Sequence, residues 1–263
     1  MKRRTMLKGA VVGLSGTATA TTGAAETEQE CDIVVSASCD GNFKSIGSAA
    51  SEASSGETIC GKPGVYEEEV WVETDDMTFR GNPGKSETLG AGQNRPIIDG
   101  ASLTKEHGAG FRTGRARGTT IKGFEIRNFK QPAFGTGITA GPFNITISDN
   151  YLHGFSANGI ARAGFGQVNP HDYTGERNQV EKTAKNEIRL DNVSDTVAQN
   201  NIVENERWGL KNGTEETISA ERNHSGSPTG PRRRTPGKGT NWIENGDVVF
   251  GPVDLIPWEP TQI

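Results

Sequence analysis

Two stretches of the sequence, Thr119-Thr-Ile-Lys-Gly-Phe-Glu-Ile-Arg-Asn128 and Ile145-Thr-Ile-Ser-Asp-Asn-Tyr-Leu-His-Gly154, follow the same pattern. Each has a β-branched triplet, a polar turn and a second short apolar run. A glycine-containing bend then leads to a third run, as at Gly159-Ile-Ala-Arg162. The pattern returns at 196–205 and starts again at 217–223. Self-similarity of this kind is the signature of a repeat protein.

The spacing of equivalent residues gives the length of the repeat. Ile121 and Ile147 lie 26 residues apart, and Val197 and Ile218 lie 21 apart. Ile147 and Ala198 lie 51 residues apart, which corresponds to two repeats. The period is therefore about 21 to 26 residues, with three short strands in each repeat. Strands this short cannot form a globular core alone, so each coil must stack on the next.

Stacking by parallel pairing places equivalent side chains in ladders, with a rise of about 4.8 Å per coil. We expect Ile121, Ile147 and Ala198 to form an inward ladder. Asn150 and Asn201 are expected at one bend, where asparagine tolerates left-handed backbone and its amide can bond to the next coil. These features predict an all-β fold, a single-stranded right-handed parallel β-helix. A leucine-rich horseshoe is disfavoured because the sequence has no Leu-x-x-Leu-x-Leu frame.

The composition agrees with a thin, turn-rich architecture. Glycine makes up 35 of the 263 residues, and hydrophobic residues make up only 32%. A TIM barrel or a helical bundle needs more apolar residues, and no stretch after the N-terminus is apolar enough to span a bilayer.

The beginning and end of the repeat region carry a family resemblance. The segments 40–50, Gly56-Glu-Thr-Ile59 and Lys62-Pro-Gly-Val-Tyr-Glu-Glu-Glu-Val70 are similar to the opening of pectin-lyase-like right-handed β-helix proteins. There a capping helix and a strand precede Pro-Gly-x-Tyr-x-Glu. The segments 223–231 and 246–258 resemble the close of surface β-helix proteins of the periplasmic copper-site accessory type. The resemblance covers about residues 38 to 260. It implies the fold and a short N-terminal cap, but this fold carries lyases, hydrolases, esterases and inert adhesins.

The first 25 residues have the layout of a twin-arginine export signal. Arg3 and Arg4 precede a weakly apolar run that ends at Gly23-Ala-Ala25. We therefore expect a signal peptide at 1–25, a β-helix domain at 26–263, and a secreted or cell-surface location. That export route carries folded proteins.

Removal of this segment makes the chain more acidic. The signal holds four cations and no acid, so 28 − 4 = 24 basic residues face 33 acidic ones, and the net charge becomes 24 − 33 = −9. This charge argues against a nucleic-acid binder, which would have a basic footprint. We expect a monomer without a membrane span.

Three cysteines, Cys31, Cys39 and Cys60, lie near the mature N-terminus. In an exported protein one disulfide among them is expected, and the sequence leaves the pair open. A metal site is disfavoured because no Cys-x-x-Cys pair is present.

The motifs of the esterases and polygalacturonase-type hydrolases of this fold are missing, which leaves a lyase. Elimination across a uronate needs a basic residue to take the proton beside the carboxyl group. It also needs a cation, either Ca²⁺ or a second basic side chain, to stabilise the intermediate. The candidate catalytic residues are Arg189, Lys182, Lys185 and Arg162. Asp149 and Asp191 are candidate ligands for Ca²⁺, the one cofactor that this chemistry suggests.

Two interruptions of the repeat are predicted as long loops, at about 164–186 and 227–240. The first contains aromatic and charged side chains suited to stacking on a sugar and pairing with an acidic group. Together with one histidine outside it, the predicted substrate-binding residues are His153, Phe165, His171, Tyr173 and Arg177. The second contains Pro231-Arg-Arg-Arg-Thr-Pro-Gly-Lys238, a local basic segment. It is typical of a mobile loop, and the alternative is a contact with an acidic polymer.

Four Asn-x-Ser/Thr triplets fit the glycosylation pattern of an exported chain, at Asn144, Asn192, Asn212 and Asn223. An Asn/Thr-rich β-helix also produces such triplets by chance.

These observations predict an exported protein that binds or processes extracellular polysaccharide, by lyase-type elimination on uronate sugars if it is catalytic. The alternative is a non-catalytic surface or accessory β-helix that binds a partner or a glycan.

Overall fold

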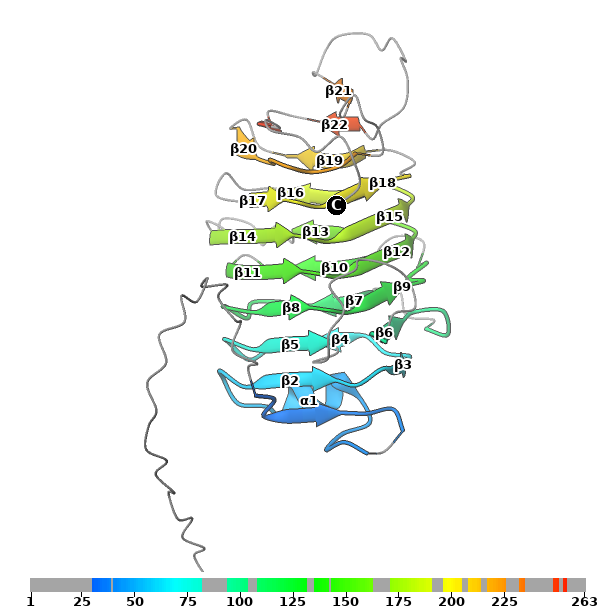
Figure 1. Ribbon diagram of the computed structural model, residues 1–263, viewed down its shortest axis with the longest axis vertical. Coiled ribbons are helices and arrows are strands. Elements are labelled where there is room, and N and C mark those ends of the chain that lie inside the picture. The colour runs from blue at the N-terminus through cyan, green and yellow to red at the C-terminus, as the bar shows by residue number, and fades with distance from the viewer. Residues whose placement is uncertain are drawn as a thin grey trace, which may run out of the picture.

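Six successive coils of the computed structural model contain three strands each, and the coils stack into a right-handed parallel β-helix (Figure 1). The predicted fold class is therefore confirmed. The structure describes residues 30–38, 40–81, 94–103, 108–131, 135–141, 143–162, 171–190, 196–204, 208–213, 217–225, 232–234, 248–250 and 253–254.

The strands form three parallel sheets, named A, B and C in the order in which each coil visits them. Sheet A contains, in spatial order, β1 (Ile33–Val35), β2 (Thr58–Gly61), β5 (Thr78–Gly81), β8 (Thr120–Lys122), β11 (Phe143–Ser148), β14 (His171–Glu176), β17 (Thr196–Ala198), β20 (Ile218–Ser219) and β23 (Val253–Asp254). Sheet B contains β3 (Gly64–Tyr66), β6 (Pro96–Asp99), β9 (Glu125–Arg127), β12 (Tyr151–Phe155), β15 (Gln179–Thr183) and β18 (Asn201–Val203). Sheet C contains β4 (Val70–Trp71), β7 (Ala109–Arg112), β10 (Thr136–Ala140), β13 (Ile160–Arg162), β16 (Asn186–Leu190), β19 (Trp208–Asn212), β22 (Val248–Phe250) and β21 (Arg232–Arg234).

The core is a set of side-chain ladders that point inward from the three sheets. On sheet A, Ile121 pairs with Ile147, Ile147 with Gly175, and Gly175 with Val197. The expected ladder is confirmed at Ile121 and Ile147. At its upper end the prediction was one residue off, because Ala198 pairs with Glu176 in a row that is only partly buried. A shift of one residue in a strand moves a side chain to the opposite face.

Four asparagines form a buried ladder at the turn between sheets A and B, namely Asn150, Asn178, Asn200 and Asn223. The amide of Asn178 donates to Ile147 O at 2.9 Å and to Asn200 Oδ1 at 3.1 Å. Its oxygen accepts from the backbone and side-chain amides of Asn150, both at 3.1 Å. The amides of Asn150, Asn178 and Asn200 thus each join their own coil to the coils on both sides, and Asn223 joins its coil to the preceding one. The expected asparagine turn is confirmed at Asn150, while Asn200 takes the place predicted for Asn201.

The residue before each ladder asparagine has left-handed backbone, with φ of 57°, 50°, 56° and 56° at Asp149, Arg177, Gln199 and Arg222. The same bend is therefore built four times, and each one aims an asparagine side chain into the turn.

A short helix closes the N-terminal end of the solenoid, α1 (Ile46–Glu52). Glu68 caps it from the next segment, because its carboxylate accepts from Ser45 Oγ at 2.6 Å and from the backbone amides of Ile46 and Gly47 at 2.7 and 2.8 Å. Tyr66 is buried, and its hydroxyl donates to Lys62 O at 2.8 Å. The Tyr66-Glu67-Glu68 segment therefore holds the cap in place.

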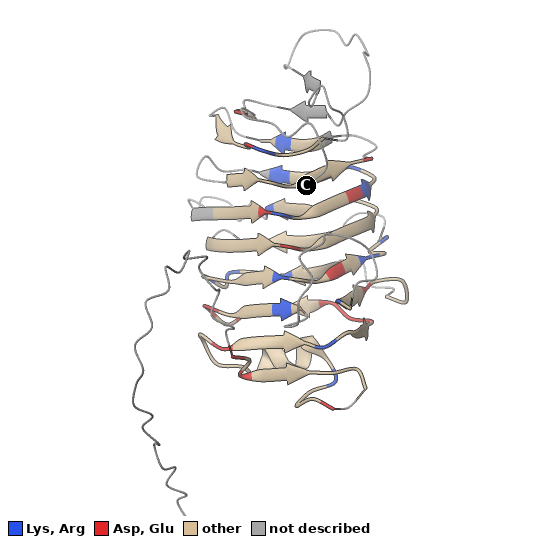
Figure 2. Ribbon diagram, in the orientation of Figure 1, with Lys and Arg blue, Asp and Glu red and all other residues tan. Residues whose placement is uncertain are grey.

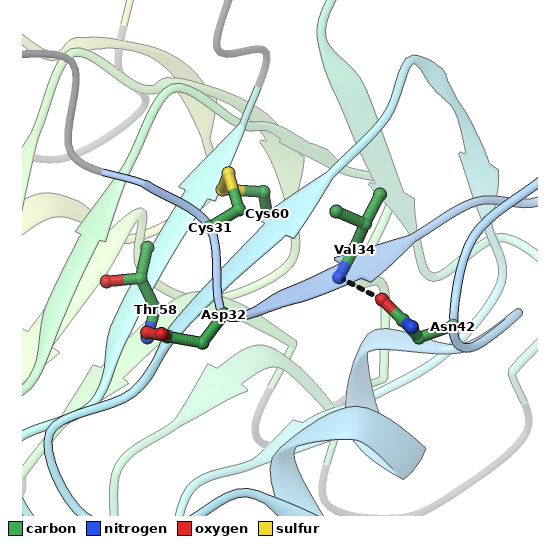
Figure 3. Close-up of a disulfide and its surroundings, with 6 residues drawn as sticks. All are labelled: Cys31, Asp32, Val34, Asn42, Thr58 and Cys60. Atoms are coloured by element: carbon green, nitrogen blue, oxygen red, sulfur yellow. Dashed lines mark hydrogen bonds between the residues drawn. A yellow bond between two sulfur atoms is a disulfide. The ribbon is translucent and has the colours of Figure 1, made fainter. Parts of the chain in front are cut away.

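The disulfide joins Cys31 to Cys60 and ties the chain before β1 to β2 (Figure 3). Beside it, Asp32 Oδ2 accepts from the backbone amide of Thr58 at 2.8 Å. The predicted disulfide is confirmed and its pair is now assigned, while Cys39 lies outside the described residues.

The prediction of a long loop over 164–186 is wrong for the part that the structure describes. β14 (His171–Glu176), β15 (Gln179–Thr183) and the first residue of β16 lie in this range, and these three strands form a regular coil that continues all three sheets. The sequence pattern does not reveal this coil, because Gly175 occupies the position at which the neighbouring coils carry Ile147 and Val197. The second predicted loop also contains a strand, since β21 lies within 227–240 and pairs with β22. Residues 163–170 lie outside the described part.

We predict that Asn178→Ala lowers the free energy of unfolding by about 3 kcal/mol, because it leaves the amide hydrogens of Asn150 and the carbonyl of Ile147 buried without their partner. Chemical denaturation measures the change. Ser219→Ala, which removes an exposed polar side chain from sheet A, should change the same quantity by less than about 0.5 kcal/mol. Equal effects of the two substitutions would contradict the structural importance of the ladder.

We also predict that reduction of the disulfide, or Cys31→Ser, lowers the free energy of unfolding by about 3 to 4 kcal/mol, because the bond closes a long segment of the unfolded chain. The two cysteines are 29 residues apart in sequence. Cys39→Ser should leave the stability of the oxidised protein unchanged, and a loss of stability there would indicate a different pairing.

Candidate functional site

The outer face of sheet B carries a network of polar, charged and aromatic side chains that bond to one another across five successive coils. We call it the sheet-B network, and it consists of Asp99, Glu125, Arg127, Tyr151, His153, Gln179, Glu181, Lys182 and Glu204. Arg127 bonds Asp99 at 2.7 Å and Glu125 at 3.0 Å. His153 Nε2 lies 3.1 Å from the Glu125 carboxylate. The His153 ring stacks on Tyr151, with 4.4 Å between ring centroids.

The other half of the network is centred on Glu181. Its carboxylate accepts from the Tyr151 hydroxyl at 2.6 Å and from Gln179 Nε2 at 3.2 Å, and it pairs with Lys182 at 3.1 Å. Burial tends to raise the pKa of Glu181, but these hydrogen bonds outweigh burial and hold the pKa below its ordinary value. Burial and the Glu181 carboxylate raise the pKa of the Tyr151 hydroxyl.

The sheet-B network does not suit a polyanionic ligand. Four carboxylates, Asp99, Glu125, Glu181 and Glu204, face two cations, Arg127 and Lys182. The predicted residues His153 and Lys182 belong to it, and both are already bonded to carboxylates. The excess of carboxylates would repel the negative charge of an acidic sugar here.

Arg162 and Tyr173 lie inside the solenoid wall. Arg162 is buried, donates to Gly141 O at 2.6 Å, and lies 5.7 Å from the ring of Tyr173. Tyr173 points inward from β14 and is fully buried. Neither side chain is accessible to a polysaccharide on the outer surface.

Asp149 and Arg177 form an ion pair at the turn between sheets A and B. Both oxygens of Asp149 accept from the guanidinium of Arg177, at 2.8 and 3.0 Å. This pairing raises the pKa of Arg177. Within the described residues no three acidic, histidine or cysteine side chains gather as metal ligands, and Asp149 already has a cation in Arg177. The residues present therefore do not fit the expected Ca²⁺ site, whose second candidate, Asp191, lies outside the described part.

The remaining predicted residues do not converge with these. Lys185 is half-buried in the turn between sheets B and C, where its backbone amide donates to Ala157 O at 2.9 Å. His171 begins β14 and pairs with Phe143. Phe165 lies outside the described residues. The predicted site thus divides among three sheets and their turns, because residues close in sequence follow the coil around its perimeter.

The outer face of sheet C carries a different row, formed by one outward register position in six successive strands. This sheet-C row consists of Trp71, Arg112, Thr139, Ala161, Arg189 and Lys211. Figure 2 shows basic segments in β16 and β19, where the row passes through them. Its described side chains are basic or neutral, and only Arg189 was predicted as a site residue.

Trp71 and Arg112 form a braced aromatic platform at the N-terminal end of this row. The indole of Trp71 is 50% exposed, and it is one of two large hydrophobic residues exposed in the described chain. The guanidinium of Arg112 lies 4.8 Å from the centre of the ring. Glu69, whose side chain is almost fully buried, holds Arg112 in place, because Arg112 Nε donates a 3.0 Å hydrogen bond to Glu69 Oε1. The sequence did contain a signal, since Trp71 alternates with Val70 and Val72 in a strand pattern that turns the indole outward.

Comparison with known proteins gives a family and no named relative. A family model described as "Protein of unknown function (DUF1565)" matches residues 36–226, which is most of the chain. No curated protein and no solved structure matches the chain.

The sheet-B network predicts a loss of stability in acid. The pKa values of Asp99 and Glu181 are lowered in the folded state, from ordinary values of 3.8 and 4.5. Their contribution is therefore complete above the unfolded pKa values and is lost as the pH falls through the folded ones. We expect the free energy of unfolding to fall as the pH drops below about 5 and to go on falling through the lowered folded pKa values, and Glu181→Gln to flatten this dependence. Glu73→Gln, at an exposed position, should leave the slope as in the wild type, and an unchanged slope in Glu181→Gln would contradict the assignment.

Proposed function

The chain belongs to the DUF1565 family, and we propose that it is an exported β-helix protein that binds acidic polysaccharide, with uronate polymers as its ligand class, along the outer face of sheet C. The observation that carries the proposal is the sheet-C row, in which an exposed tryptophan and three cations share one register position along the solenoid axis.

The platform supports sugar binding. A half-exposed indole offers a large rigid apolar surface at low entropic cost, which suits the apolar face of a sugar ring. Because Arg112 is held between Glu69 and Trp71, the platform is largely ordered before a ligand arrives.

The spacing of the row supports an extended polymer rather than a single sugar. Successive coils rise by about 4.8 Å, so the row from β4 to β19 spans five such steps. Arg189 and Lys211 are direct neighbours on β16 and β19 and bring two positive charges to the C-terminal half. On a chain with a net charge of −9 after removal of its signal, this face is complementary to a polyanion.

Elimination at this row would use Arg189 as the base that takes the proton beside the uronate carboxyl group, with Lys211 pairing the carboxylate. The alternative is binding without catalysis. Two other predicted catalytic residues favour it, because they lie outside the sheet-C row: Lys182 pairs with Glu181, and Arg162 donates to Gly141 O.

Export through the twin-arginine route is part of the proposal. Its support is the paired Arg3 and Arg4 before a weakly apolar run and a resemblance to exported pectin-lyase-like proteins. In the part of the chain that the structure describes, no helix has the length and apolarity needed to cross a bilayer.

We predict that residues 26–263 bind a soluble polyuronate, and that Arg189→Ala/Lys211→Ala weakens binding about tenfold at low salt, because two favourable charge contacts are lost. Affinity electrophoresis or titration calorimetry measures it. The matched control is Arg80→Ala/Lys122→Ala, which removes two cations from neighbouring strands of sheet A and should bind like the wild type. Equal weakening by both pairs would indicate a general charge effect and contradict the proposed face.

The same samples test catalysis and the platform. Ultraviolet absorbance, with and without Ca²⁺, detects the unsaturated product of elimination, and a signal that Arg189→Ala abolishes would establish the lyase. A flat absorbance trace with intact binding would favour the non-catalytic alternative.

Trp71→Ala should weaken binding of acidic and neutral polymers alike, and unchanged affinity in this variant would contradict the role of the aromatic platform.

A further inference from the structure

The four Asn-x-Ser/Thr triplets of the sequence occupy different environments in the solenoid. Asn223 is the last member of the buried ladder, and its amide donates to Val197 O and Ala220 O, both at 2.8 Å. Asn212 is also buried, at the end of β19. A folded protein cannot present either amide to an enzyme without exposing a buried side chain. Asn192 lies outside the described residues.

Asn144 lies near the start of β11 on the outer surface of sheet A. Its side chain is exposed, and among the described residues its amide makes no hydrogen bond. Its backbone is left-handed, with φ of 43°, which lifts this end of the strand out of regular extended geometry. The register of β8 with β11 covers only Thr146–Ser148, so β8 does not run alongside Asn144.

The hydroxyl needed for recognition is also at the surface. Ile145 and Ile147 are buried, so Thr146 between them points outward, because side chains alternate along a strand. Asn144 precedes this regular stretch, and its own side chain is exposed. Thr146 is partly exposed. The complete Asn144-Ile145-Thr146 motif is therefore presented on the surface of the folded protein.

We propose that Asn144 is an N-glycosylation site of the exported protein. The inference rests on the proposed export, and export in the folded state makes accessibility decisive, since the enzyme then meets only surface motifs. The donor is a polyprenyl-phosphate-linked oligosaccharide. The bond from its anomeric carbon to the phosphate oxygen breaks, a bond to Asn144 Nδ2 forms, one Nδ2 proton leaves, and the lipid phosphate departs with the bonding pair.

A pair of variants at Thr146 tests the proposal without touching the asparagine. Thr146→Val keeps the β-branched shape and removes the hydroxyl, whereas Thr146→Ser keeps the hydroxyl and the motif. The protein is isolated from the outside of the cells that naturally make it, and the peptide containing Asn144 is examined by mass spectrometry. We expect added sugar mass in the wild type and in Thr146→Ser, and complete loss of that mass in Thr146→Val.

The outcomes separate this inference from the proposed function. An exported chain that begins near Glu26 and carries an unmodified Asn144 would overturn the inference and leave export and polysaccharide binding standing. Sugar on Asn212 or Asn223 would overturn it as well, since those amides would have to be modified before folding. A chain found only inside the cell with its leader intact would overturn both the export and the modification.

Discussion

The hydrogen-bonded stacking of coils at the A–B turn is the constraint on which the rest of the molecule depends. A coil of three short strands has no core of its own, so its inward side chains are buried only if the next coil arrives in register. The buried amides of Asn150, Asn178, Asn200 and Asn223 fix that register, because each bonds to a neighbouring coil, and the first three bond to the coils on both sides of their own. Once the turn is fixed, the inward rows of all three sheets follow.

The same register organises the outer surface into rows that run along the axis. Since outward residues align from coil to coil, each sheet accumulates its own charge character independently of sequence distance. On the outer face of sheet B, carboxylates outnumber cations, and the two predicted site residues there, His153 and Lys182, are already bonded to carboxylates. The outer face of sheet C instead aligned Trp71 with Arg112, Arg189 and Lys211. Charge complementarity is therefore the reason that we propose sheet C as the face that binds an acidic polymer.

The N-terminal end of the solenoid is closed by side chains from one segment. Glu68 caps α1, and the Tyr66 hydroxyl lies within hydrogen-bond distance of Val35 O and Lys62 O. Together with the Cys31–Cys60 disulfide, these contacts close the end of the solenoid where no further coil can cover the core.

The sequence alone determined the fold, the asparagine turn, the presence of a disulfide and the acidic charge, because these follow from local pattern and composition. It located Ile121, Ile147 and Asn150 correctly, since their coils repeat a visible β-branched triplet. It failed for the coil at 171–190, where Gly175 replaces the inward apolar residue, and it placed Tyr173 on the surface although the ring fills the core beside that glycine. Only the tertiary structure decided which side chains meet, which cysteines pair and which asparagine triplet is exposed. Those properties depend on residues about one coil apart in sequence, and their alignment is set by stacking between coils.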